Sequence, residues 1–181
     1  QGTVLLAKMI ADVVLRSGRG ECMAIPEFGV ERRGAPVLAY ARICDKPIHV
    51  RTRIYEPDAV VVLDTAFAAG PAVSVGLKKG GTIVLNTEET PAALAARLPG
   101  FKTRVVPAKR IALAHKLGSA TSPVVNTAMC GAICAIFKLA DEASLEAAIR
   151  EAVPVKHDKN VAAAREAFLL CSKDEKAHAA A

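Results

Sequence analysis

The chain has 181 residues and a net charge of +6, and 52% of its residues are hydrophobic whereas only 4% are aromatic. This length is typical of a single domain that buries a core without disulfides or metals, and the hydrophobic content excludes a disordered tail. Because the basic residues are dispersed among acidic ones and few aromatic rings are available to stack on bases, the composition argues against nucleic-acid binding.

Two further features bear on location. No uninterrupted apolar run approaches the roughly 20 residues that a membrane-spanning helix needs, and the first residues lack the order of charged, apolar and small residues that marks a signal peptide. The odd number of cysteines, without dense spacing, favours reduced thiols in a cytoplasm. They are Cys22, Cys44, Cys130, Cys134 and Cys171. We therefore expect a cytoplasmic protein without membrane association.

Short apolar runs bounded by turn residues predict strands. We place these strands at residues 22–25, 37–43, 48–54, 58–64, 82–85 and 102–106. The runs at residues 37–43 and 48–54 flank a turn at Pro47 and indicate an antiparallel hairpin. Residues 58–64 are apolar on both faces, which is typical of a central strand in a parallel sheet.

Apolar residues at helical spacing predict helices. We place these helices at residues 3–17, 65–75, 91–98, 108–117, 127–137, 144–151 and 159–170. Gly18 is positioned to end the first helix, and the polar, alanine-rich residues 172–181 are expected to fray. The order of elements predicts one α/β domain over residues 1–181, with three layers (α/β/α), a mostly parallel sheet, an antiparallel hairpin insertion and a helical C-terminal end.

The start of the chain is unusual for such a domain. The residues Gln1 and Gly2 lead at once into the first helix, whereas an α/β domain normally begins with a strand and a turn that feed that helix. We therefore expect a first strand and most of a glycine-rich turn to be missing upstream of Gln1.

The loop at residues 26–36 is the densest group of charged residues and glycines in the sequence. Glu31 and Arg33 lie among glycines, which allow another backbone or a ligand to approach closely. Arginine side chains and backbone N–H groups in such a loop could bind an anion or a partner surface. The alternative is an internal Glu–Arg ion pair that only shapes the loop.

Asn126 and Thr127 open a predicted helix. The side chain of Asn126 is suited to an N-cap, because it can accept hydrogen bonds from the exposed N–H groups of the first turn. A helix start also attracts anions, so these two residues are a candidate anion site. Simple capping is the alternative.

We identify no catalytic residue and no metal site in the sequence. Cys130 and Cys134 lie four residues apart on one helix, but no further ligands follow at zinc or iron–sulfur spacing, so we interpret them as buried thiols. The four histidines do not pair with a nucleophile or a carboxylate in a recognisable motif. Asp64 and Asn86 end buried strands, where ligands bind in open parallel sheets, although polar residues also end strands for solubility.

Six short stretches, taken together and in order, resemble the gamma subunit, or gamma domain, of the 2-oxoacid:ferredoxin oxidoreductases. They cover about residues 1 to 170. The stretches are Gln-Gly at 1–2, Phe-Gly-Val-Glu-Arg-Arg-Gly-Ala-Pro-Val at 28–37, Arg-Ile with Lys-Pro-Ile at 42–48, Tyr-Glu-Pro-Asp at 55–58, Gly-Leu-Lys with Gly-Gly at 76–81, and Asn-Thr-Ala-Met with Gly-Ala at 126–132. The family opens with a glycine-rich turn that ends in Gln-Gly, so Gln1 and Gly2 match the remnant of that turn.

The resemblance implies a subunit of an enzyme that oxidatively decarboxylates a 2-oxoacid with coenzyme A (CoA) and forms an acyl-CoA. It implies that the complex holds thiamine diphosphate with Mg and 4Fe–4S clusters, and that alpha, beta and delta-type subunits carry them. Electrons would pass to ferredoxin or another acceptor. The version of the loop at residues 31–36 is more similar to enzymes for pyruvate or for aryl or branched acids than to those for indolepyruvate or 2-oxoglutarate.

The resemblance also suggests a role for this chain itself. It would pack on the alpha part and border the route for CoA, with Glu31, Arg32, Arg33 and Gly34 on that face. Two alternatives remain at this point. One is a free-standing Rossmann-like nucleotide-binding module, which would need a complete glycine-rich turn and an acidic residue after its second strand. The other is a scaffold domain without a ligand.

Overall fold

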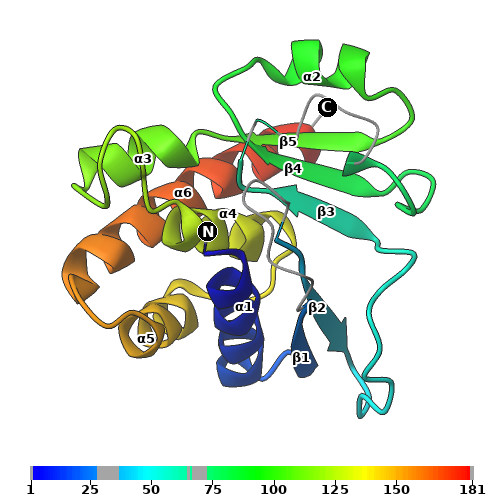
Figure 1. The fold of residues 1–181 in the computed structure, drawn as a ribbon, viewed down its shortest axis with the longest axis horizontal. Coiled ribbons are helices and arrows are strands. Elements are labelled where there is room, and N and C mark those ends of the chain that lie inside the picture. Colours follow the sequence, from blue (N-terminus) through cyan, green and yellow to red (C-terminus); the bar gives the residue numbers. More distant parts are fainter. Residues whose placement is uncertain (1, 28–36, 65, 67–72, 180–181) are drawn as a thin grey trace.

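The computed structural model describes residues 2–27, 37–64, 66 and 73–179. Helices and strands are arranged in layers (Figure 1). The strands are β1 (Glu21–Pro26), β2 (Ala39–Cys44), β3 (Ala59–Val62), β4 (Thr82–Asn86) and β5 (Lys102–Val106). The helices are α1 (Thr3–Ser17), α2 (Pro91–Arg97), α3 (Ala108–Ala114), α4 (Asn126–Ile136), α5 (Glu142–Ala152) and α6 (His157–Ala179). The predicted helix at residues 65–75 falls mostly outside the described residues.

The central layer is a parallel sheet in the order β3-β4-β5. Ile83 and Leu85 on β4 are fully buried in an apolar cluster with Leu94 of α2, which covers one face (Figure 1). Val84, between them, is fully buried in the larger cluster with residues of α1, α4 and α6 on the other face. Because successive side chains of a strand point to opposite faces, this split confirms the three-layer α/β/α fold.

Among the described residues, β4 rather than β3 lies at the centre of this sheet. Residues 58–64 were expected to be central because they are apolar on both faces, but β3 pairs only with β4 among the described residues. Its apolar character has another cause. Val60 and Val62 pack in the cluster with α2, whereas Val61 and Leu63 pack in the larger cluster, so this strand is covered on both faces without being central.

The antiparallel hairpin is confirmed, but its strands differ from those predicted. β1 pairs with β2 from Glu21 opposite Cys44 to Pro26 opposite Ala39, and α1 packs against both strands. The predicted strand at residues 48–54 is wrong, because residues 47–55 form no strand in the structure. β2 pairs with β1 along one edge, and residues 47–55 approach β2 only through the side chain of Arg42, whose Nη2 lies 3.4 Å from the carbonyl oxygen of Thr52.

The helical end is built on a close crossing of α4 and α6. Gly131 of α4 makes this crossing possible, because a Cβ atom at this position would lie 1.9 Å from the carbonyl oxygen of Ala164. The expected fraying after residue 171 is wrong, since α6 continues to Ala179. Alanine is the strongest helix former, so an alanine-rich tail extends a helix that packing has already started. Among the described residues, no helix combines the length and the apolar character needed to span a membrane.

Candidate functional site

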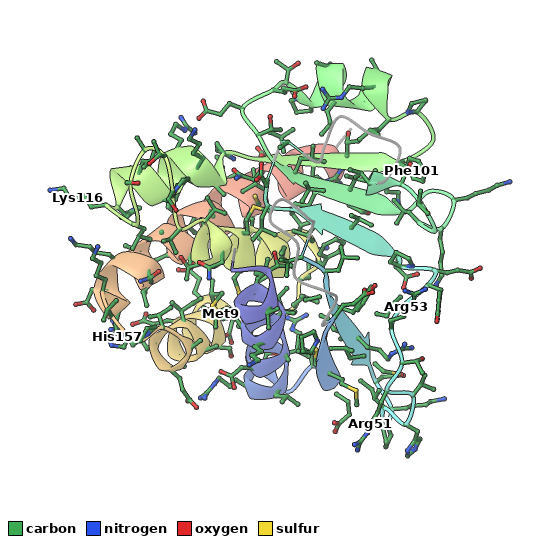
Figure 2. All side chains as sticks on the ribbon, viewed as in Figure 1. Met9, Arg51, Arg53, Phe101, Lys116 and His157 are labelled. Carbon is green, nitrogen blue, oxygen red and sulfur yellow. The ribbon has the colours of Figure 1, made fainter. Side chains whose placement is uncertain are left out.

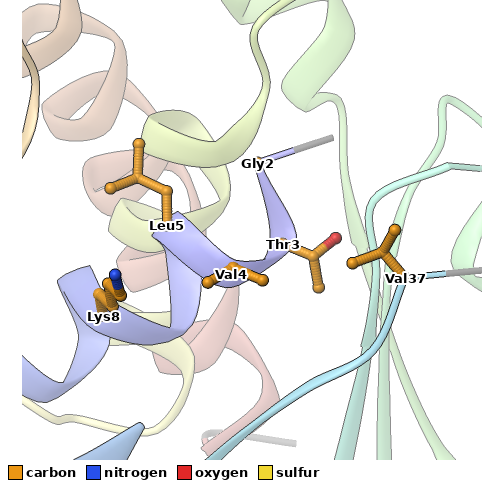
Figure 3. A pocket seen from close by; sticks show the side chains of 6 residues that line it. All are labelled: Gly2, Thr3, Val4, Leu5, Lys8 and Val37. Atoms are coloured by element: carbon orange, nitrogen blue, oxygen red, sulfur yellow. The ribbon is translucent and has the colours of Figure 1, made fainter. Parts of the chain in front are cut away.

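A pocket of about 460 Å³ opens at the N-terminus of α1 (Figure 3). The side chain of Thr3 points toward Val37, which lies two residues before β2 begins. Lys8 lies about one helical turn further along α1. The lining residues are Gly2, Thr3, Val4, Leu5, Lys8 and Val37. The pocket therefore joins the start of the chain to the segment that follows the loop at residues 28–36.

The N-terminus of α1 gives this pocket a positive character. Gly2 is the N-cap residue, adopts a left-handed backbone with φ of 81°, and accepts a hydrogen bond from the N–H group of Leu6 at 2.8 Å. The first turn contains no acidic residue. The N–H groups of a first helical turn have no partner within the helix and carry the positive end of the helix dipole. Together with the exposed ammonium group of Lys8, they favour an anionic group in the pocket.

Gly2 also contacts the start of α4, which was the second predicted anion site. A Cβ atom on Gly2 would lie 3.0 Å from Nδ2 of Asn126. The structure corrects the assignment of Asn126 as an N-cap, because Val125 is the N-cap and Asn126 is the first residue of the helix. From there, Oδ1 of Asn126 accepts a hydrogen bond from the N–H group of Thr127 at 3.0 Å. The side chain of Asn126 thus provides a hydrogen-bond acceptor for one N–H group of the first turn, although Asn126 is itself part of the helix.

Thr127 is fully buried, and its hydroxyl group donates a hydrogen bond to Oδ1 of Asn160 at 3.1 Å. Asn160 in turn donates to the carbonyl oxygens of Val155 and Lys156. The side chain of Thr127 therefore fastens α4 to the beginning of α6. An anion at the start of α4 remains a prediction, and it would bind through backbone N–H groups rather than through this hydroxyl.

The remaining predicted site residues lie outside the described part of the chain. These residues are Gln1, Glu31, Arg32, Arg33 and Gly34. The two segments that flank residues 28–36 are described, and the N–H group of Glu27 donates to the carbonyl oxygen of Leu38 at 3.1 Å. The structure thus brings three of the predicted regions together. Gly2, Asn126 and the segment after the loop, at Val37, all lie at the N-terminus of α1.

Sequence analysis missed a polar network beside the loop. The carboxylate of Glu27 accepts a hydrogen bond from the hydroxyl group of Tyr40 on β2, and its Oε1 lies 3.5 Å from Nη1 of Arg53. The guanidinium of Arg53 lies 4.4 Å from the ring centre of Tyr55. Partial burial, reinforced by the hydrogen bond to Glu27, raises the pKa of Tyr40 above its usual value. No periodic pattern indicates this network, because its members come from three different segments.

Three cysteines, Cys22, Cys130 and Cys134, have thiols that are largely withdrawn from solvent. Cys130 and Cys134 are fully buried on α4, which confirms their interpretation as buried residues. The hydrogen bond between the two thiols and their burial hold the pKa of Cys130 well above its usual value. Burial also raises the pKa of Cys22 to about 11. Because the thiolate is the reactive form, these cysteines are poor nucleophiles.

Two further polar groups have structural partners. Asn86 at the end of β4 donates to the carbonyl oxygen of Leu63 at 2.8 Å and accepts from the N–H group of Lys109 at 3.0 Å. It therefore connects the end of β3 to the start of α3, which explains its position after a buried strand. His115 lies 2.7 Å from Glu166, so this contact links α3 to α6. The two residues are far apart in sequence, which is why the pairing could not be predicted.

Metal-ligating groups do not gather in the described part of the chain. No cluster of three or more His, Cys, Asp or Glu side chains there is arranged to hold a metal ion. The arrangement that the structure does present is an α/β/α domain with an electropositive pocket at a helix N-terminus. In the sequence, an arginine-containing segment directly precedes Val37, which lines that pocket.

Comparisons with known proteins assign this domain to a family. The family model described as "Pyruvate ferredoxin/flavodoxin oxidoreductase" matches residues 1–170. The "Pyruvate/ketoisovalerate oxidoreductases common subunit gamma" of Thermococcus kodakarensis is 43% identical over 172 residues, which cover 93% of this chain and 90% of the relative. The "Pyruvate synthase subunit PorC" of Methanocaldococcus jannaschii is 41% identical over 169 residues, which cover 93% of this chain and 89% of the relative.

A solved structure supports the same assignment. The crystal structure of the pyruvate oxidoreductase subunit PORC from Thermotoga maritima matches this fold with a TM-score of 0.74 and 28% identity, covering 93% of this chain and 89% of that chain. The fold is thus similar to that of a pyruvate oxidoreductase subunit. The chain belongs to the pyruvate ferredoxin/flavodoxin oxidoreductase family. The family resemblance found in the sequence is confirmed.

Proposed function

We propose that this chain is the gamma subunit of an enzyme that oxidatively decarboxylates a 2-oxoacid with CoA and passes the electrons to ferredoxin or another acceptor. The observation that carries the proposal is an identity above 40% along nine-tenths of relatives named as gamma or PorC subunits of pyruvate and ketoisovalerate enzymes. Pyruvate or a branched 2-oxoacid is the substrate that these names favour, and an aryl acid is the more distant option.

The chain's own contribution is to pack on the catalytic subunits. The support is an apolar surface at the hairpin, whose side chains are about half exposed although they are large and hydrophobic. These residues are Val37, Leu38, Ile43, Val50 and Tyr55. Exposed apolar residues that gather on one part of a surface are typical of a protein–protein contact. We assign it to the alpha subunit, in a complex that also contains beta and delta-type subunits.

We assign the cofactors of the complex to these partner subunits. Among the described residues, the thiols of Cys130 and Cys134 lie together on α4, but they are fully buried and hydrogen-bonded to each other, which does not suit the ligands of an iron–sulfur cluster. Thiamine diphosphate with Mg and the 4Fe–4S clusters would therefore lie outside this chain. All five cysteines are free thiols, which is typical of a reducing compartment and supports a cytoplasmic complex.

The second contribution of the chain is to border the CoA site. CoA carries phosphate groups, and phosphates bind to helix N-termini and to arginine forks. The pocket at the N-terminus of α1 supplies the first-turn N–H groups and Lys8, and Arg32 and Arg33 stand in the loop that precedes Val37. Because a helix N-terminus and Lys8 give the pocket a positive character, and Val37 in its lining directly follows this loop in the sequence, we assign the CoA phosphates to this part of the chain.

The test combines assembly with kinetics. Native mass spectrometry of the complex, purified anaerobically from its source, should detect this chain bound to larger subunits. The Arg33→Ala variant should raise the KM for CoA several-fold, while the complex stays assembled. Arg97→Ala is the matched control, because Arg97 lies on α2 and pairs with Glu89. A chain that purifies alone and binds a nucleotide would contradict the proposal and favour the free-standing module. An unchanged KM for CoA in Arg33→Ala would contradict a contact between this loop and CoA.

A further inference from the structure

The β1–β2 hairpin has one face that is turned away from the core. Cys22 and Ala41 pack in the large apolar cluster with α1, and successive residues of a strand point to opposite faces. Their neighbours therefore form an outer face, which consists of Glu21, Met23, Ile25, Tyr40, Arg42 and Cys44. Met23 and Ile25 are only half-buried and belong to neither apolar cluster of the described residues. The hairpin thus keeps large apolar side chains outside the core.

Arg42 lies in the middle of this outer face, opposite Met23 in the register. Its Nε atom is buried and makes no hydrogen bond, and no Asp or Glu in the described part of the chain forms an ion pair with it. Its Nη2 atom has one long contact at the surface, 3.4 Å from the carbonyl oxygen of Thr52. Enclosing part of a guanidinium without these partners costs free energy. The described residues therefore do not explain why an arginine stands here.

The segment at residues 47–55 borders the outer face and adds positive charge. Its Arg53 pairs with the carboxylate of Glu27, which also accepts the hydroxyl hydrogen bond of Tyr40. Figure 2 shows Arg51 and Arg53 on the side of the hairpin away from α1, and both side chains are exposed. The carboxylate of Glu27 is thus already shared between two partners, and it does not neutralise Arg42.

The chemistry of the outer face suits an acidic side chain of another protein. The N–H groups on Nη1 and Nη2 at the end of a guanidinium bind a carboxylate in bidentate form. Arg, Tyr and Met are enriched at protein interfaces, and apolar neighbours that exclude water strengthen an ion pair. The outer face contains all three residue types. It is also continuous with the apolar surface proposed above, because Arg53 lies 4.4 Å from the ring centre of Tyr55.

We propose that Arg42 binds a carboxylate side chain of the alpha subunit and anchors the contact between that subunit and the hairpin. The inference rests on the proposed function, because it names the chemistry of the contact through which this chain joins the complex. An aspartate or glutamate of the partner would accept hydrogen bonds from the exposed end of the guanidinium. Met23 and Ile25 would become buried around the ion pair.

The first experiment measures how tightly the complex holds this chain. A dilution series analysed by native mass spectrometry gives the Kd of the chain in the assembled complex. Arg42→Gln removes the charge and should raise this Kd about tenfold or more. The thermal unfolding midpoint of the full chain should stay nearly unchanged, because the substitution also removes an unpaired charge. Arg97→Gln is the matched control, because Arg97 is a partly exposed arginine of α2 that pairs with Glu89.

The second experiment identifies the partner of Arg42. Arg42→Lys keeps the positive charge and supplies an amine for coupling with a water-soluble carbodiimide. The reagent activates a carboxylate that touches this amine, an amide bond forms, and the carboxylate oxygen leaves in the urea by-product. Peptide mass spectrometry of the complex should detect a cross-link from residue 42 to an aspartate or glutamate of the alpha subunit. Arg97→Lys should give no cross-link to that subunit.

The outcomes separate this inference from the proposed function. A raised Kd in Arg42→Gln together with the cross-link to the alpha subunit supports the inference. If the native chain assembles but Arg42→Gln is held as tightly as Arg97→Gln, the anchor is overturned and the proposed function stands. A cross-link only within this chain or to a second copy of it overturns the inference in the same way. If the native chain purifies without larger subunits, the proposed function fails and this inference fails with it.

Discussion

The packed core of the helical side and the surface of the hairpin differ in how far their large apolar residues are exposed. On the helical side, Met129 and Ile149 are fully buried, and polar groups such as Thr127 are buried with a hydrogen-bond partner. On the hairpin side, Leu38 and Tyr55 are about half exposed beside a network of partly exposed charges. Buried apolar residues of the first kind stabilise the fold, whereas the exposed apolar residues of the hairpin are the surface that we propose for contact with another subunit.

The strongest test of this comparison is the crossing of α4 and α6. Gly131→Ala should lower the free energy of unfolding by about 3 kcal/mol or more, since its Cβ would lie 1.9 Å from a backbone oxygen of Ala164 and the helices would have to separate. Chemical denaturation measures the effect. Gly100→Ala is the control, because its Cβ meets no atom within 4 Å and only its left-handed backbone costs about 1 kcal/mol. Equal losses in the two variants would contradict the close crossing.

A pair of leucines compares the two regions directly. Leu94→Ala empties a fully buried site between α2 and the sheet, and should cost about 2–4 kcal/mol of stability. Leu38→Ala, at a half-exposed site, should change stability by less than about 0.5 kcal/mol but weaken binding to the catalytic subunits about tenfold. Thermal unfolding and a binding titration measure the two quantities. If Leu38→Ala bound normally, the apolar surface at the hairpin would not be the contact.

Asn86 tests whether the end of the parallel sheet is structural. Asn86→Ala leaves the carbonyl oxygen of Leu63 and the N–H group of Lys109 without this partner in a nearly buried site, so we expect a loss of about 1–2 kcal/mol. Denaturant unfolding measures the loss, and the KM for CoA should stay unchanged. A raised KM with normal stability would instead place a ligand at the ends of these strands.

The smallest expected effect concerns the hairpin and alkaline pH. Because burial raises the pKa of Cys22 from 9.0 to about 11, the unfolded thiol ionises between these values while the folded thiol keeps its proton. The unfolded state then binds fewer protons, so the contribution of Cys22 to stability falls as pH rises through this range. Unfolding midpoints from pH 8 to 11 should decline less in Cys22→Ala than in the native protein. Parallel declines would show that the thiol ionises alike in both states.

Much of the fold could be predicted because its causes are local. The bounds of α1 and β5 agree with the residues predicted, since an amphipathic helix ended by Gly18 and a short apolar run bounded by turns are both visible along the chain. Of the candidate site, the sequence indicated Gly2 and Asn126, which the structure brings into contact. The network of Glu27, Tyr40 and Arg53 could not be predicted, because it joins segments that only the fold brings together.

The sequence by itself determined the family, the layered α/β class and the positions of most helices, because apolar periodicity and short motifs are properties of neighbouring residues. Only the tertiary structure decided which strands pair. β2 pairs with β1 rather than with residues 48–54, since α1 covers the β1–β2 hairpin and buries part of it. Likewise only the fold showed that Thr127 bonds to Asn160 and that Val37 reaches the pocket of α1. Strand pairing and buried polar contacts depend on residues that are far apart in the sequence, so they cannot be predicted from local spacing.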